Sequence, residues 1–185
     1  MCQAYQRPKT HASMADAVAA AELKHAADFD PESEREQFTA FIRRRLQDEP
    51  GDHAVLRLQL EWTQDDASSD DEVDHANAVI KAADAAIDSI DADEIAAWYG
   101  REHDGEDVDV DEESADMKAR RALLVDALLA KAAAQSRLLT AADESNRAQR
   151  HDAFESTWSQ LEAWGDPASM DDGFELAVER ERRRG

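Results

Sequence analysis

Apolar residues recur at helical spacing along most of the chain. The densest run reads ALLVDALLAKAAA, from Ala122 to Ala134, and only Asp126 and Lys131 interrupt it. A helix that is apolar on nearly every side has to be covered by other elements. The run is too short to cross a bilayer, which takes about 20 apolar residues. The pattern therefore predicts a buried central helix in an all-α fold.

Capping and breaking residues divide the rest of the chain into further helices. Asp30 and Pro31 suit the N-cap and the first residue of a helix. Ser69 with Glu72, and Asp91 with Glu94, have the spacing of a capping box. Breaks are expected at Pro50-Gly51, at Gly100, at residues 143–146 and at Gly165-Asp166-Pro167. The expected helices lie at about residues 15–27, 31–49, 55–62, 92–99, 112–139, 147–164 and 169–183, together with one that follows the Ser69 cap and runs to about residue 90.

One of these segments also fits a strand. Leu56, Leu58, Leu60 and Trp62 alternate with polar residues, which is a strand pattern. No other stretch alternates in this way, and a single strand has no partner for its backbone groups. We therefore predict a helix, in which Val55, Leu58 and Trp62 share one face.

The segment after residue 72 carries a seam whose members are spaced alternately by three and four. Such a seam packs against a neighbouring helix. Together with short connections it predicts about eight antiparallel helices, arranged as a helical bundle or as a short α-solenoid of helix pairs. The seam residues are Val73, Ala76, Ile80, Ala83, Ile87 and Ile90.

The chain is strongly acidic, with 43 Asp and Glu against 21 Lys and Arg and a net charge of −22. Asp exceeds Glu, and Arg supplies most of the positive charge, as in proteins from organisms that keep molar salt in the cytoplasm. At about 1 M salt the Debye length is about 3 Å, so the repulsion is screened. The sign of the charge disfavours nucleic acid as a partner. A surface that mimics nucleic acid or binds a basic partner is a weaker reading.

Residues 1–13 contain no acidic residue, which breaks the composition of the chain. We read them as a disordered leader, or as the product of an upstream start codon, and residues 14–185 as one all-helical domain. Cys2 is the single cysteine, so no disulfide framework is expected. No signal peptide or transmembrane segment is visible, which predicts a cytoplasmic protein without a membrane partner.

Two Glu-x-x-His pairs are the strongest metal candidate. Glu22 with His25, and Glu72 with His75, have the spacing found in carboxylate-bridged di-iron bundles. That site also needs a Glu from each of two further helices, and the central helix offers only Asp126 within its apolar stretch. We keep a carboxylate-bridged metal enzyme as the alternative hypothesis.

Other candidates have simpler readings. Asp107, Asp109 and Asp111 alternate as at the start of an EF-hand, but Lys118 stands where a bidentate Glu is needed. A solvated acidic loop is the preferred reading. The four tryptophans are expected to pack in the core. Asp126 has no partner at favourable spacing on its own helix, so a structural ion pair with another helix is expected.

The order of two segments resembles a known family. Residues 73–100 read VDHANAVIKAADAAIDSIDADEIAAWYG, and residues 116–134 read DMKARRALLVDALLAKAAA. Together they resemble the helical C-terminal part of tripeptidyl-peptidase II, a giant subtilisin-type serine peptidase that assembles into large oligomers. The likeness covers about the middle third of the chain, with weaker matches on either side.

The resemblance implies a non-catalytic module. The subtilisin domain of the family has no counterpart here, so no catalytic residue can be assigned by resemblance. In the family, the helical region has a structural and assembly role. We therefore expect an interaction or assembly module rather than an enzyme, without a cofactor. Its partner would be a protein, either a separately encoded peptidase or further copies of the chain.

Overall fold

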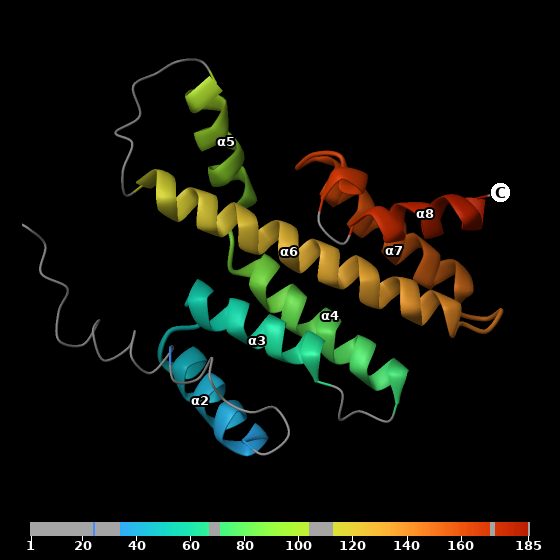
Figure 1. Cartoon of the computed structure of the whole chain (residues 1–185), viewed down its shortest axis with the longest axis horizontal. Helices are drawn as coiled ribbons and strands as arrows, with labels where there is room; N and C mark the ends of the chain where they lie inside the picture. Colours follow the sequence, from blue (N-terminus) through green and yellow to red (C-terminus); the bar gives the residue numbers. More distant parts are fainter. Residues whose placement is uncertain (1–23, 25–33, 67–70, 104–112, 171–172, 185) are drawn as a thin grey trace, which may run out of the picture.

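A computed structural model describes residues 34–66, 71–103, 113–170 and 173–184, together with Lys24. These residues form seven α-helices and one short 3-10 helix, and no strand is found among them (Figure 1). The prediction of an all-α fold is confirmed. The elements are α2 (Arg35–Asp48), α3 (His53–Asp65), α4 (Glu72–Asp88), α5 (Ala92–His103), α6 (Glu113–Thr140), α7 (Arg147–Glu162), η1 (Pro167–Ser169) and α8 (Gly173–Arg184).

The eighth expected helix, at residues 15–27, lies outside the described residues apart from Lys24. The same holds for the leader at residues 1–13 and for the cap at Asp30 and Pro31. The expected count of eight is therefore one higher than the seven α-helices that the structure describes.

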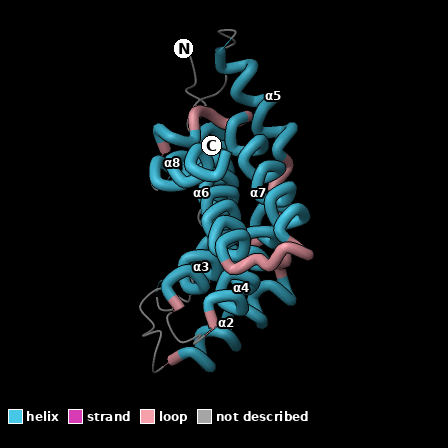
Figure 2. Tube along the Cα trace, turned by 90° about the vertical axis from the view of Figure 1, so that its right-hand side faces the viewer, coloured by secondary structure: helices cyan, strands magenta, loops and turns pink. Residues whose placement is uncertain are grey.

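The 28 residues of α6 form the axis of the molecule. In Figure 1, α3 and α4 lie on one side of α6, and α5, α7 and α8 lie on the other. Seen from the side, α2 and α5 are at opposite ends (Figure 2). The predicted burial of the apolar run is confirmed, because Leu123, Leu124, Ala127 and Leu128 are almost fully buried.

The segment with strand-like alternation is the helix α3, as predicted. Its residues alternate because α3 is covered on two faces. Val55, together with Leu58 and Trp62, packs against α2, where the Trp62 ring stacks on Phe38 at 3.7 Å between centroids. Leu56 and Leu60 point into the main core beside α4 and α6.

The seam of α4 differs from the predicted one. Ala76 and Ala83 are buried as expected, but Ile80 and Ile87 are half-buried. The most buried positions also include Val79, Ala82 and Ala86. Small side chains let two backbones approach closely, so α4 turns its alanine-rich side to α6, the neighbour with which it makes its most extensive contact.

One predicted helix cap and one predicted helix end were wrong. The N-cap of α4 is Asp71, whose side chain accepts hydrogen bonds from the backbone N–H groups of Val73 and Asp74, while Ser69 lies outside the described residues. Gly100 does not end α5, which continues to His103. Glycine inside a helix costs about 1 kcal/mol but does not stop it. The predicted cap at Asp91 is confirmed by its bond from the N–H of Glu94, at 3.0 Å.

The last helix starts later than predicted, at Gly173 rather than near Ser169. Asp166 caps a 3-10 turn first, by accepting from the N–H of Ala168 at 3.1 Å. The chain then folds back so closely that a Cβ atom on Gly173 would lie 1.9 Å from the carbonyl oxygen of Pro167. This close approach requires glycine and fixes where α8 leaves η1.

A candidate interaction groove

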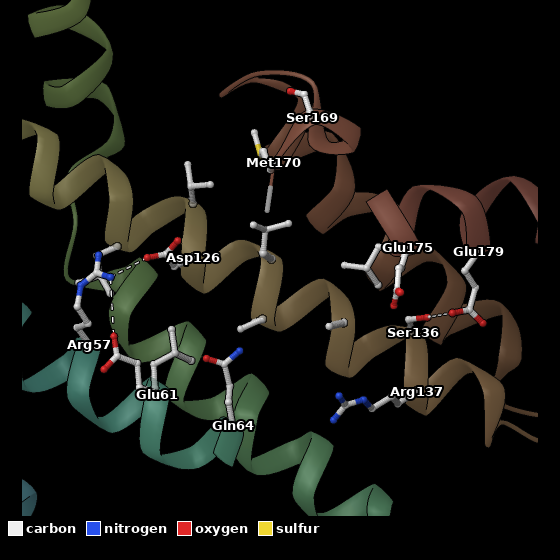
Figure 3. Close-up of a pocket in the computed structure, with 17 residues that line it drawn as sticks. Arg57, Glu61, Gln64, Asp126, Ser136, Arg137, Ser169, Met170, Glu175 and Glu179 are labelled. Atoms are coloured by element: carbon white, nitrogen blue, oxygen red, sulfur yellow. Dashed lines mark hydrogen bonds and ion pairs between the residues drawn. The ribbon is translucent and has the colours of Figure 1, made fainter. Parts of the chain in front are cut away.

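An open groove of about 790 Å³ runs along α6 between α3 and α8 (Figure 3). Its floor includes a stripe of α6 that is only partly covered by neighbouring helices. Val125, Leu129 and Ala133 follow each other along this stripe at spacings of four and are all half-buried. These three side chains are apolar and partly accessible, while polar and charged side chains line the rest of the groove, which makes it a candidate binding surface.

The wall from α3 is held to α6 by an ion pair. The Arg57 Nη1 atom lies 2.8 Å from the Asp126 carboxylate and 4.0 Å from the carboxylate of Glu61. Asp126 thus takes its partner from another helix, as predicted. Its side chain is half exposed, so the pair orients the wall rather than adding much stability. On the opposite side of α6, Lys131 makes a similar contact with Asp84 at 2.7 Å.

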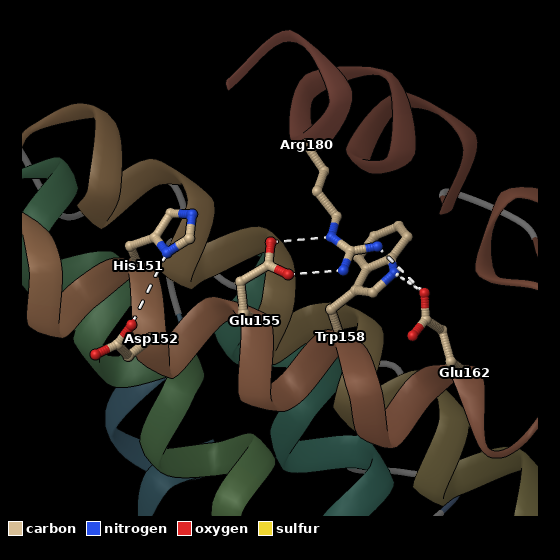
Figure 4. A network of polar contacts seen from close by, with 6 residues as sticks. All are labelled: His151, Asp152, Glu155, Trp158, Glu162 and Arg180. Atoms are coloured by element: carbon tan, nitrogen blue, oxygen red, sulfur yellow. Dashed lines mark hydrogen bonds and ion pairs between the residues drawn. The ribbon is translucent and has the colours of Figure 1, made fainter. Parts of the chain in front are cut away.

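The wall from α8 is anchored to α7 through Arg180 (Figure 4). Its guanidinium forms two hydrogen bonds to Glu155, at 2.9 and 2.6 Å, and a third to Glu162 at 3.2 Å. It also lies over the Trp158 ring, 4.8 Å from the centroid. The hydrogen bonds to Glu155 raise the pKa of Arg180, so the charge that holds α8 is permanent.

The end of the groove near the C-terminus of α6 is polar. Arg183 donates to the carbonyl oxygen of Ser136 at 3.2 Å and to the Thr140 hydroxyl at 2.9 Å. It also pairs with Glu179 at 2.8 Å. From α7, Arg150 donates to the carbonyl oxygen of Leu138. Positive side chains at this position complement the negative end of the helix dipole.

A smaller pocket of about 290 Å³ shares lining residues with the opposite end of the groove. Lys118 and Arg121 supply positive charge there, and Arg121 lies over the ring of Tyr99 at 5.2 Å. Arg121 also donates to the carbonyl oxygen of Trp164 at 2.9 Å. Lys118 and Arg121 thus lie at one end of the groove, and charges of both signs, Glu175, Glu179 and Arg137, lie toward the other.

The structure describes two of the four residues of the metal hypothesis, Glu72 and His75. Glu22 and His25 lie outside the described residues. Glu72 is exposed at the start of α4, and the Nε2 atom of His75 lies 2.9 Å from the carbonyl oxygen of Thr63. Among the described residues no group of three or more His, Cys, Asp or Glu is placed to hold a metal. The metal hypothesis thus remains untested.

The remaining candidates from the sequence are the acidic loop and the four tryptophans. Asp107, Asp109 and Asp111 lie outside the described residues. Trp98 and Trp158 are almost fully buried, and Trp62 and Trp164 are half-buried, so all four pack against the cores as predicted.

Sequence reasoning missed the groove. Its signal is present in the central run, where Val125, Leu129 and Ala133 share a face with Asp126 and Arg137. A charge at each end of an apolar stripe marks a side that faces water. Because apolar residues dominate the run, its pattern predicts cover on all sides and does not reveal this partly open stripe.

In the part of the chain that the structure describes, no helix has the length and apolar character needed to cross a bilayer. No family model matches the chain, and no solved structure does either. Among curated proteins, tripeptidyl-peptidase 2 of Oryza sativa subsp. japonica is 32% identical over 173 residues, which cover 92% of this chain. Tripeptidyl-peptidase 2 of Arabidopsis thaliana is 27% identical over 157 residues, or 82% of this chain.

The matches cover most of this chain but only a small part of each relative. They span 13% of the Oryza protein and 11% of the Arabidopsis protein. The resemblance stated from residues 73–100 and 116–134 is confirmed and extends beyond them. Over most of its length, the chain is similar to a small part of tripeptidyl-peptidase 2.

Proposed function

We propose that the chain is a non-catalytic interaction and assembly module, and that the groove along α6 receives a helix of a partner protein. The observation that carries the proposal is the half-buried apolar floor formed by Val125, Leu129 and Ala133. An amphipathic helix that binds in a groove buries such a stripe with residues at spacings of three and four.

The chemistry of the groove favours binding over catalysis. None of the described residues that line it is a histidine or a cysteine. The hydroxyl of Ser136 donates toward Glu179 at 3.5 Å, and Asp126 is paired with Arg57. These groups stabilise the walls rather than form a nucleophile and base pair.

Similarity to a small part of a peptidase supports a peptidase as the partner, acting in trans, with further copies of the chain as the other option. The acidic composition supports a halophilic, cytoplasmic setting, in which the complex forms at molar salt. At that ionic strength the apolar floor contributes more to binding than the charged rims do.

Affinity capture at about 2 M KCl tests the proposal, because charge attraction is screened at that salt concentration. We expect the tagged chain to retain a peptidase, identified by mass spectrometry, or to self-associate in sedimentation experiments. The variant Leu129→Arg puts a charge on the floor and should abolish the capture. Ser156→Arg, on the exposed side of α7, is the matched control. A monomer without a partner, or equal capture by both variants, would contradict the proposal.

A further inference from the structure

The outward face of α8 exposes apolar side chains to solvent. Phe174, in the first turn of α8, is 65% exposed and is the one exposed large apolar side chain in the part of the chain that the structure describes. Val178, one turn further along the same side, is half-buried, and neither residue belongs to the two apolar clusters of the fold. A shallow depression of about 480 Å³ on this face is lined by Ala168, Phe174, Ala177, Val178, Glu181 and Arg182. An apolar patch with a polar rim is typical of a contact surface.

Contacts on the other sides of α8 hold this face in place. Arg180 bonds Glu155 of α7, at 2.9 and 2.6 Å. Gly173 fits closely against the carbonyl group of Pro167, which fixes the start of the helix. The face is therefore formed before any partner arrives, and a preformed surface loses little conformational freedom on binding.

Two opposite charges lie along one edge of the face. Glu175 and Arg182 are seven residues apart, which places them within about 20° of each other around the helix axis. Both are exposed, and neither forms an ion pair with another described residue. When two copies of one helix pair in antiparallel fashion, the same edge of each meets that of the other, as in an isologous contact. Glu175 of each copy then lies opposite Arg182 of the other.

We infer that the outward face of α8 binds α8 of a second copy of the chain, antiparallel about a twofold axis near Val178. The two Val178 side chains meet at the axis. Phe174 of each copy covers the side chain of Arg182 of the other, and a guanidinium packs favourably on an aromatic ring. The antiparallel direction also opposes the two helix dipoles. The inference goes beyond the proposed function, because it uses the outward face of α8 rather than the floor of the groove.

The size of the face sets the expected strength of the dimer. The 12 residues of α8 are about 18 Å long at 1.5 Å per residue. One side of such a helix buries less than the roughly 800 Å² per partner of a standard interface, so the dimer is weak and depends on protein concentration. Apolar contact does not depend on charge, and partly buried ion pairs are screened less than exposed ones. The dimer should therefore persist in molar KCl.

Sedimentation equilibrium of the full chain at about 2 M KCl tests the inference. The parent should shift from monomer to dimer as its concentration rises. Phe174→Glu should weaken the dimer at least about tenfold, as truncation of a buried aromatic anchor does in other interfaces. Ala85→Glu, at an exposed position of α4, adds the same charge elsewhere and should leave the association unchanged. Circular dichroism verifies that each variant is folded.

Exchange of the two edge charges tests the antiparallel direction. Glu175→Arg and Arg182→Glu each place like charges opposite each other, so each should weaken the dimer several-fold at the lowest salt at which the chain is folded. The two variants change the net charge in opposite directions, so an effect of net charge alone would move them apart. The double variant restores opposite charges across the axis and should return to the affinity of the parent. A double variant as weak as the single ones would refute the antiparallel pairing.

A parent that stays monomeric over the whole concentration range would overturn the inference, and so would equal association of the parent and Phe174→Glu. If Leu129→Arg rather than Phe174→Glu abolishes self-association, the copies meet through the groove, so the inference is wrong and the proposed function stands. If Phe174→Glu releases a captured peptidase from a monomeric chain, the face binds another protein and the inference is again wrong. If Phe174→Glu abolishes self-association while Leu129→Arg changes neither association nor capture, the inference stands and the proposed function fails.

Discussion

The Nε2 atom of His75 lies 2.9 Å from the carbonyl oxygen of Thr63. At the other end of the same helix pair, the Nε2 atom of His53 lies 3.3 Å from the carbonyl oxygen of Ser89. A carbonyl oxygen can only accept, so each Nε2 atom carries a proton and donates. Each of α3 and α4 therefore has, near its start, a histidine that bonds the chain near the end of the other helix.

Replacing His75 by alanine removes one of these two hydrogen bonds between α3 and α4. We expect His75→Ala to lower the free energy of unfolding in urea by about 1 kcal/mol, the net value of a typical hydrogen bond. His151→Ala, in which the ring makes only a 4.0 Å contact with Asp152, should change it by less than about 0.5 kcal/mol. Elemental analysis of the same proteins also tests the metal hypothesis, which requires stoichiometric metal that is lost in His75→Ala.

The alanine-rich side of α4 leaves no room for larger side chains. Ala83 is fully buried against the core, and Ala85 on the same helix is exposed. Ala83→Leu should destabilise the protein by about 1–3 kcal/mol through overpacking, while Ala85→Leu should change stability by less than about 0.5 kcal/mol. Thermal unfolding of the two variants measures the difference. Equal melting temperatures would mean that α4 does not approach α6 as closely as described.

Arg180 holds α8 against α7 by bonds that only a guanidinium can make. Arg180→Lys keeps the charge but loses the two parallel bonds to Glu155 and the stacking on Trp158, which should cost about 1–2 kcal/mol. Arg180→Ala should cost about 2–3 kcal/mol, because Glu155 is then left partly buried without this partner. Arg182→Ala, an exposed neighbour on α8, is the control. Chemical denaturation followed by tryptophan fluorescence reports these losses.

Helix positions were predictable from the sequence because their signals are local. The cap at Asp91 and the break at Gly165-Asp166-Pro167 depend on the residues themselves and on their immediate neighbours. The end of α5 and the start of α8 were not predictable in this way. A Cβ atom on Gly100 would have no neighbour within 4 Å, so the fold does not require glycine there. A Cβ atom on Gly173 would clash with Pro167, a contact that arises only in the folded chain.

The position of the groove depends on contacts between helices that are far apart in the sequence. The sequence identified the stripe with Leu129 as apolar, but which side of α6 stays uncovered depends on where α3 and α8 come to lie. The position of α8 depends on Arg180 and Glu155, 25 residues apart in the chain. The ion pair of Asp126 was predictable as a requirement, because an apolar helix needs a partner for its charge, but Arg57 could not be named from spacing.

The turn before α7 should respond to pH. The Asp143 carboxylate accepts hydrogen bonds from the Ser145 hydroxyl and from the N–H groups of Asn146 and Ser145, and these bonds lower its pKa below the usual 3.8. A lowered pKa contributes stability that is complete above the unfolded value and is lost as the pH falls through the folded value.

Asp143→Asn keeps an acceptor but cannot ionise. The stability difference between the parent and this variant should be constant from pH 7 to about 5 and should shrink below about pH 4. Melting temperatures across this range measure it, with the exposed Glu144→Gln as the control. A difference that persists unchanged at the lowest pH would contradict the assignment of this effect to the charge of Asp143.

The net charge of −22 predicts a dependence on salt. Raising KCl from about 0.1 M to about 1 M shortens the Debye length from about 10 Å to about 3 Å and screens the repulsion between carboxylates. The melting temperature should therefore rise over this range. Choline chloride should act similarly if screening is the cause, and a flat or falling curve in both salts would argue against a protein adapted to brine.

Among the described α-helices, α2 is the one without a sizeable contact to α6, and it packs on α3 through a small cluster of buried residues. Phe38, Phe41 and Ile42 can leave that cluster together while the main core stays intact. A helix that packs on a small cluster outside the main core can open at a lower free energy than global unfolding. Amide protons of α2 should accordingly exchange with deuterated solvent well before those of α4 and α6. The first loss of native structure then occurs on α3, so the helix that forms one wall of the groove would lose the support of α2 before the core around α6 opens.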